Sequence, residues 1–276
     1  MAGLARRPLG NTGCDVSALA LGGVTYNLHD DEHAATVVHR AIDLGINYID
    51  TGYGYSDSER KIGLVMAERR NEVFLATKSN ARDRDGMLSH IEESLRRLRT
   101  EQIDLYQVHD LGTEEQIGRI TASDGALRAL EEARQGGLIR FIGVTGHRSP
   151  DILAKALREY PFDTVLTSLG AMHAAVRPFY ETVVPAARER GAGVLAMKVM
   201  AYGWLAERAE QAIRFALGLP EVAAAVVGVD DIAELEQDVR AAEAYEPLSD
   251  AERDDLLATA RTIYQARSDE AWFIKR

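Results

Sequence analysis

The chain alternates short apolar runs with longer stretches in which apolar residues recur every three or four positions. The short runs, rich in β-prone residues, lie at 18–21, 48–50, 73–77, 103–108, 141–145, 164–167, 193–197 and 223–229. Runs that are apolar at nearly every position are typical of strands buried on both faces, as in parallel sheets. The pattern therefore predicts eight buried parallel strands.

The stretches between these runs predict amphipathic helices. Residues 31–45 begin with acidic side chains, carry Val37, Ala41 and Leu44 on one stripe, and stop at Gly45. The same scheme recurs at 85–98, 124–136 and 231–242. Strands that each precede an amphipathic helix indicate a parallel sheet covered by helices.

Eight such units in 276 residues suit a closed (β/α)8 TIM barrel better than an open sheet. Two short arms around Gly10–Gly13 predict a β-hairpin before the barrel, and residues 249–265 predict an extra helix after it. No linker or low-complexity segment divides the series. We therefore expect a single α/β domain over residues 1–276.

Composition narrows the class of protein. The net charge of -11 would repel nucleic acid and anionic membranes. Of this charge, residues 221–276 carry a net -8, from 14 acidic and 6 basic side chains. The lone Cys14 can form neither an internal disulfide nor a thiolate metal site. With no secretory or membrane-spanning segment, we expect a cytoplasmic protein with no metal, nucleic-acid or membrane partner.

Candidate chemistry lies where the predicted strands end. The second strand ends at Asp50, five residues before Tyr55, the third at Lys78 and the fourth at His109. In a barrel of this type, functional groups come from the C-terminal ends of strands, so these four should share one rim. A phenol has a reference pKa of about 10, which a neighbouring ammonium lowers. The set suits protonation of a carbonyl oxygen, with the imidazole orienting that oxygen.

Each of the four also has an ordinary structural interpretation. Asp50 alone could cap a turn, Tyr55 could pack on the rim, Lys78 could form a structural ion pair with Asp50, and His109 could be a buried rim histidine. Four titratable groups on successive strand ends make a purely structural explanation of all of them much weaker.

These residues resemble a known family. The segment Ile49-Asp-Thr-Gly-Tyr-Gly-Tyr-Ser-Asp-Ser-Glu-Arg-Lys-Ile-Gly63 is similar to the aldo-keto reductase signature. Ala76-Thr-Lys-Ser79 and Ile103-Asp-Leu-Tyr-Gln-Val-His109 resemble the family's lysine and histidine strands. The resemblance extends from about residue 7 to residue 245. It implies carbonyl reduction with NAD(P)H, with Tyr55 as general acid, Lys78 tuning it, Asp50 holding the lysine and His109 orienting the substrate carbonyl.

The resemblance also implies a cofactor-binding edge along the barrel mouth. Its residues would be Gly22, Gly23, Asp50, Thr145, Gly146, Met197, Lys198, Gly228, Asp230, Glu234 and Asp238. Some of these depart from the family pattern. Thr145-Gly146 replaces the usual Ser-Asn on the fifth strand, and Met197-Lys198 replaces an aromatic residue on the seventh. The latter resembles a branch with Ala-Met-Lys here, without the iron–sulfur extension that some members of the branch carry.

The acidic C-terminal region bears on the choice of cofactor. Where the family holds a 2′-phosphate with Lys, Ser and Arg, this chain has Val229, Asp230 and Glu234. Carboxylates repel a 2′-phosphate, whereas an Asp can accept hydrogen bonds from the ribose hydroxyls of NADH. Alternatively, these acidic side chains serve only to stabilise the N-terminal turn of the next helix and play no part in cofactor choice. We expect good use of NADH, with NADPH left open.

Two other functions fit the same residues. A barrel lyase or aldolase would use Lys78 or Lys198 for a Schiff base. A non-catalytic subunit would use the barrel to sense a dinucleotide. Histidines His33 and His39 are interpreted as ordinary helix residues. The pattern indicates neither the physiological carbonyl substrate nor the oligomeric state.

Overall fold

The parallel strands close into a barrel, as the apolar runs predict. The computed structural model describes residues 3–25 and 29–270. Within these residues the barrel order is β10 (Val222–Gly228), β3 (Leu19–Gly22), β4 (Tyr48–Asp50), β5 (Phe74–Ser79), β6 (Ile103–Val108), β7 (Ile139–Gly146), β8 (Thr164–Ser168) and β9 (Gly193–Met197). The fold is therefore a (β/α)8 TIM barrel.

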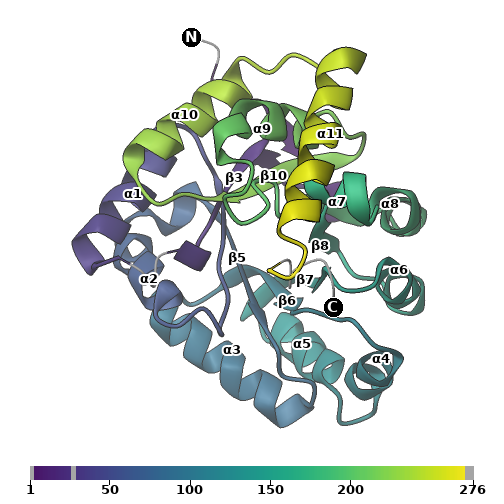
Figure 1. The fold of residues 1–276 in the computed structure, drawn as a ribbon. Coiled ribbons are helices and arrows are strands. Elements are labelled where there is room, and N and C mark those ends of the chain that lie inside the picture. The colour runs from purple at the N-terminus through teal and green to yellow at the C-terminus, as the bar shows by residue number, and fades with distance from the viewer. Residues whose placement is uncertain (1–2, 26–28, 271–276) are drawn as a thin grey trace.

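Helices surround the barrel (Figure 1). They are α1 (Asp31–Asp43), α2 (Ser58–Arg69), α3 (Arg84–Leu98), α4 (Glu114–Thr121), α5 (Ala126–Gln135), α6 (Pro150–Glu159), α7 (Ala171–Val176), α8 (Tyr180–Arg190), α9 (Ala209–Leu217), α10 (Ile232–Glu243) and α11 (Asp250–Ala266). Short 3₁₀ turns lie at η1 (Gly10–Thr12), η3 (Arg70–Glu72) and η4 (Ala206–Arg208). Each of the helices predicted from periodicity is present within a few residues of its expected bounds.

Local chemistry sets where the helices begin. The Asp30 side chain accepts a hydrogen bond from the His33 N–H and starts α1, and the Asp83 side chain does the same for Gly86 in α3. The tail helix α11 begins with a reciprocal capping box between Ser249 and Glu252. Such caps satisfy backbone donors that a helix leaves unpaired in its first turn.

The predicted N-terminal hairpin is present. Its strands β1 (Arg6–Pro8) and β2 (Asp15–Ser17) pair antiparallel across η1. Leu9 and Val16 are fully buried and pack with side chains of the barrel interior, including Leu195 and Tyr48. The hairpin therefore helps to fill the interior from the N-terminal end of the strands.

Two layers of apolar side chains make the core. One fills the barrel interior and includes Tyr48, Phe74, Leu105 and Leu166. The larger one lies between the strands and the surrounding helices. Because both faces of each strand are covered, the strand sequences are continuously apolar rather than alternating. Within the described ranges, no helix combines the length and apolar character needed to cross a membrane.

Candidate active site

A cavity of about 790 Å³ opens at the C-terminal ends of the barrel strands. All four candidate catalytic residues line it, namely Asp50, Tyr55, Lys78 and His109. The cavity then extends to the end of β10 and the first turns of α10, where Asp230, Glu234 and Asp238 lie. Four residues from the ends of three consecutive strands are thus brought to one rim.

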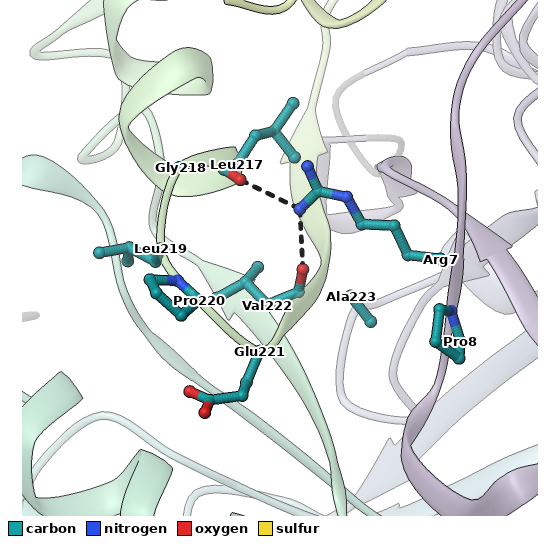
Figure 2. Close-up of a pocket in the computed structure, with 9 residues that line it drawn as sticks. All are labelled: Arg7, Pro8, Leu217, Gly218, Leu219, Pro220, Glu221, Val222 and Ala223. Atoms are coloured by element: carbon teal, nitrogen blue, oxygen red, sulfur yellow. Dashed lines mark hydrogen bonds between the residues drawn. The ribbon is translucent and has the colours of Figure 1, made fainter. Parts of the chain in front are cut away.

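A smaller pocket lies at the other end of β10. Figure 2 shows Arg7 there, donating hydrogen bonds to the carbonyl oxygens of Leu217 (3.0 Å) and Val222 (2.9 Å). The same guanidinium lies 5.8 Å from the centre of the Tyr245 ring. Because its charge is occupied in joining the hairpin to β10, we interpret this pocket as structural. None of the residues predicted to be functional lines it.

Asp50 and Lys78 form a buried ion pair. The Lys78 Nζ donates to Asp50 Oδ2 and to the carbonyl oxygen of Thr51, the latter at 2.6 Å. Lys78 is 2% exposed and Asp50 is 3% exposed. Burial lowers the pKa of Lys78, but the negative charge of Asp50 and its hydrogen bond to Lys78 act the other way, and the net shift is upward. Lys78 therefore remains an ammonium at neutral pH.

The turn after β4 places Tyr55 against this ammonium. The Tyr55 N–H donates to the carbonyl of Gly52 at 2.9 Å, and the Tyr53 N–H donates to the carbonyl of Lys78 at 2.9 Å. The turn is thereby tied to β5. Lys78 Nζ lies 4.7 Å from the centre of the Tyr55 ring.

The protonation of Tyr55 differs from the sequence-based expectation. Lys78 lowers the pKa of Tyr55, as expected, but burial raises it more, and the net shift is upward. The two effects oppose each other because burial disfavours the phenolate while a neighbouring cation favours it. Before any ligand binds, Tyr55 is a neutral phenol at neutral pH.

His109 lies next to Tyr55 at the cavity wall. The two rings meet edge to face, with centroids 5.8 Å apart. Burial, and then the charge of Lys78, lowers the pKa of His109 to about 2. The imidazole is therefore neutral, and one ring nitrogen carries a proton that it can donate.

Gln107 belongs to this group, although sequence reasoning did not identify it. Its Nε2 donates to Asp50 Oδ1 at 2.9 Å, and the residue is fully buried. The sequence did contain a signal for this, because Gln107 lies two residues after Leu105 on β6, and alternate residues of a strand face the same side, here the barrel interior. A buried polar residue in an apolar run needs a polar partner.

The predicted cofactor edge is only partly assembled at the cavity wall. Nine of its eleven residues line the cavity: Gly22, Gly23, Asp50, Met197, Lys198, Gly228, Asp230, Glu234 and Asp238. Thr145 and Gly146 do not. The Thr145 hydroxyl accepts a hydrogen bond from the Asp110 N–H at 2.9 Å, and the Gly146 carbonyl accepts one from Thr167 at 2.8 Å. The next residue, His147, lines the wall instead.

Acidic groups gather at the far end of the cavity. Glu234 accepts a hydrogen bond from the Asp230 N–H at 2.9 Å. Burial, and then the charge of Glu234, raises the pKa of Asp238 to about 7. His33, a residue of α1, hydrogen-bonds the Asp230 carbonyl oxygen at 2.6 Å.

Lys198 follows β9 in a left-handed conformation, with φ of 63°. Burial, and then the charge of Lys78, lowers its pKa to about 7. Its ammonium contacts Tyr202, both through the hydroxyl and over the ring at 4.0 Å from the centroid. Lys198 is thus half charged near neutral pH.

The wall beyond His109 is polar. Asp110 accepts a hydrogen bond from Arg148 Nε at 2.8 Å and forms an ion pair with the same guanidinium, with Nη2 at 2.6 Å. His147 Nε2 lies 3.3 Å from the other oxygen of Asp110. Asn80 lines the same region. Within the two described ranges, no group of three or more His, Cys, Asp or Glu side chains is placed to hold a metal ion.

Comparison with known proteins gives the family that the sequence motifs resemble. The family model described as "Aldo/keto reductase family" matches residues 18–211. The chain therefore belongs to the aldo-keto reductase family, and it is an NAD(P)-dependent oxidoreductase.

Several relatives are individually informative. The chain is 28% identical to the L-galactose dehydrogenase of Arabidopsis thaliana, covering 88% of this chain and 89% of that protein. It is 30% identical to the D-threo-aldose 1-dehydrogenase of a Pseudomonas species, covering 75% and 69% respectively. Among solved structures, the holo form of the aldo-keto reductase AKR11C1 from Bacillus halodurans aligns with a TM-score of 0.79 at 25% identity, covering 93% and 96%.

Proposed function

We propose that this protein transfers hydride between a nicotinamide dinucleotide and the carbonyl group of a small molecule, with Tyr55 as the proton donor. The observation that carries the proposal is the contact of a buried, protonated Lys78 with the ring of a neutral Tyr55 at the cavity wall. An oxidoreductase of this family has no use for the Schiff-base role of Lys78, and a pure sensor has no use for a proton donor.

In this mechanism each side chain has a defined task. The neutral imidazole of His109 donates a hydrogen bond to the substrate carbonyl oxygen and orients it. As negative charge develops on that oxygen, the Tyr55 hydroxyl delivers its proton, and the adjacent Lys78 ammonium stabilises the phenolate that remains. Asp50 keeps Lys78 in place and charged. The bound dinucleotide supplies the hydride that reaches the carbonyl carbon.

The cavity fits a dinucleotide. Its volume of about 790 Å³ is in the range of sites for ligands of this size. Gly22, Gly23 and Gly228 line it, so backbone atoms form part of its wall. Lys198, which directly follows β9, lines the same cavity, and its ammonium would meet a pyrophosphate bound there. Asp238, buried with a raised pKa, would face the adenosine.

The far end favours NADH over NADPH. Asp230, Glu234 and Asp238 line it, and no Lys or Arg side chain within residues 3–25 and 29–270 lines that part of the cavity. A 2′-phosphate would enter a region of like charge, whereas ribose hydroxyls can donate to carboxylates.

A hydroxylated carbonyl compound suits the polar wall formed by Asn80, Asp110, His147 and Arg148. The names of the L-galactose and D-threo-aldose dehydrogenases that resemble this chain indicate the same class.

The test is to mix purified protein with NADH or NADPH and a panel of aldoses, simple aldehydes, ketones and keto acids, and to follow loss of nicotinamide absorbance. Tyr55→Phe should reduce turnover about 10²–10⁴-fold, while the dissociation constant for NADH stays nearly unchanged, because the hydroxyl supplies a proton rather than cofactor binding. Wild-type turnover in Tyr55→Phe would exclude Tyr55 as the proton donor.

A further inference from the structure

Gln107 lies inside the barrel, directly below the cavity. On β6 it pairs with Lys78 of β5 on one side and with Gly143 of β7 on the other. Partners in register in a parallel sheet point their side chains to the same face, so Gln107 and Lys78 both face the interior. The residue is fully buried.

The amide of Gln107 and the ammonium of Lys78 hold opposite oxygens of one carboxylate. Gln107 Nε2 donates to Asp50 Oδ1 at 2.9 Å, while Lys78 Nζ donates to Asp50 Oδ2. With a donor on each oxygen, the Asp50 carboxylate cannot rotate freely. The Gln107 donor is neutral, so it fixes the orientation of Asp50 without adding a second cation beside Lys78.

Gly143 leaves the room that this arrangement needs. A Cβ at position 143 would lie 2.9 Å from Gln107 Cγ and 2.5 Å from Thr164 Oγ1. Both contacts are closer than real Cβ atoms show. The glycine therefore lets the Gln107 side chain lie beside β7 and reach Asp50.

Stability alone does not account for a glutamine at this place. No residue within 3–25 or 29–270 donates a hydrogen bond to Gln107 Oε1, although this atom is buried. A buried carbonyl without a partner is unfavourable, and an apolar side chain of similar length would avoid that cost. The amide group of Gln107 instead provides the hydrogen bond to Asp50.

We propose that Gln107 is a positioning residue, which holds one oxygen of Asp50 so that the other faces Lys78 and thereby supports proton transfer by Tyr55. This inference rests on the proposed function of Tyr55. A carboxylate held facing Lys78 favours the ammonium form of that side chain, because an opposite charge nearby stabilises it. Loss of the Gln107 donor weakens the Lys78 ammonium as a partner for the phenolate. Burial then raises the pKa of Tyr55 further.

The experiment compares Gln107→Met with Gln102→Met, a matched change at an exposed glutamine just before β6. The probes are DL-glyceraldehyde with NADH, and glycerol with NAD⁺ in reverse. In the reverse direction Tyr55 must accept a proton, so kcat/KM falls at acidic pH. Gln107→Met should shift this acidic fall in the pH profile of kcat/KM upward by about one pH unit, and so lower kcat/KM at pH 7 about tenfold. The dissociation constant for NADH and the Tm should change little, and Gln102→Met should behave as wild type.

Gln107→Glu provides a second test that does not depend on how Gln107→Met folds. Its carboxylate would repel Asp50 when ionised but could donate to Asp50 when protonated. The ratio of glyceraldehyde reduction at pH 5.5 to that at pH 8 should therefore rise several-fold over wild type. Provided that Tyr55→Phe is inactive, either of two results would overturn the positioning role of Gln107. One is an unshifted pH profile of kcat/KM in Gln107→Met, and the other is an unchanged ratio of rates at pH 5.5 and pH 8 in Gln107→Glu. An active Tyr55→Phe would instead overturn the proposed function itself.

Discussion

The ammonium of Lys78 lies 4.7 Å from the centre of the Tyr55 ring, and at this cavity wall Lys78 is buried and Tyr55 is half-buried. Burial raises the pKa of Tyr55 and lowers the pKa of Lys78, because it favours the neutral form of each group. Asp50 counters this effect for Lys78 alone, so the pair is a neutral acid beside a permanent cation. That is the state needed to protonate an oxygen on which negative charge develops.

Removing Lys78 should damage both catalysis and stability. Lys78→Met leaves the Asp50 carboxylate buried without its cation, which typically costs on the order of 3–5 kcal/mol of folding free energy. Turnover should fall about 10²-fold or more. Adding Asp50→Asn should recover most of the lost Tm, because no buried charge then remains, but should not recover turnover. Thermal denaturation and steady-state kinetics measure the two effects. Recovery of turnover in the double variant would show that Lys78 acts only through structure.

Lys198 should make cofactor binding depend on pH. Its pKa of about 7 means that it is charged below neutrality and mostly neutral above. NADH affinity of the free enzyme, measured by calorimetry from pH 6 to 9, should weaken as pH rises through this range. Lys198→Met should bind about tenfold more weakly at pH 6 and show a flat profile. Lys155→Met, an exposed lysine paired with Glu114, is the control and should match wild type. A sloping profile in Lys198→Met would assign the dependence to another group.

The acids at the far end of the cavity should determine the choice of dinucleotide. Asp230→Ser/Glu234→Arg replaces two carboxylates with a hydroxyl and a cation, so the ratio of kcat/KM for NADPH over NADH should rise at least tenfold. Glu243→Arg, at the opposite end of α10, changes charge at a distance from the cavity and should leave the ratio unaltered. A wild-type enzyme that prefers NADPH a hundredfold, with no response in the double variant, would show that the adenosine binds elsewhere.

Asp238 should make stability fall as pH rises. In the folded protein its pKa is about 7, against 3.8 for an unperturbed Asp, so the folded state holds a proton between these values that the unfolded chain has lost. Stability from this group is therefore present at low pH and is lost as pH rises from about 4 to about 7. Asp238→Asn should raise the Tm at pH 8 but hardly at pH 4. Asp254→Asn, an exposed aspartate on α11, controls for net charge. Equal Tm changes at both pH values would contradict the raised pKa.

The fold and the four candidate catalytic residues were accessible from the sequence for a simple physical reason. Buried parallel strands must be apolar on both faces, and the helices that cover them must be amphipathic, so the element order is encoded locally. In a closed barrel, strand ends converge on one rim. The positions of Asp50, Lys78 and His109 along the chain were therefore enough to predict that they meet.

Only the tertiary structure decided which residues distant in the sequence contact one another, and how those contacts change protonation. Gln107 reaches Asp50 only because Gly143 on the adjacent strand leaves space, and His33 contacts Asp230 only because α1 packs beside α10. The protonation of Tyr55, Lys198 and Asp238 likewise depends on burial and on charges brought close by folding. Sequence reasoning named the cation that lowers the pKa of Tyr55. It could not weigh that cation against desolvation, because the extent of burial is a property of the packed barrel.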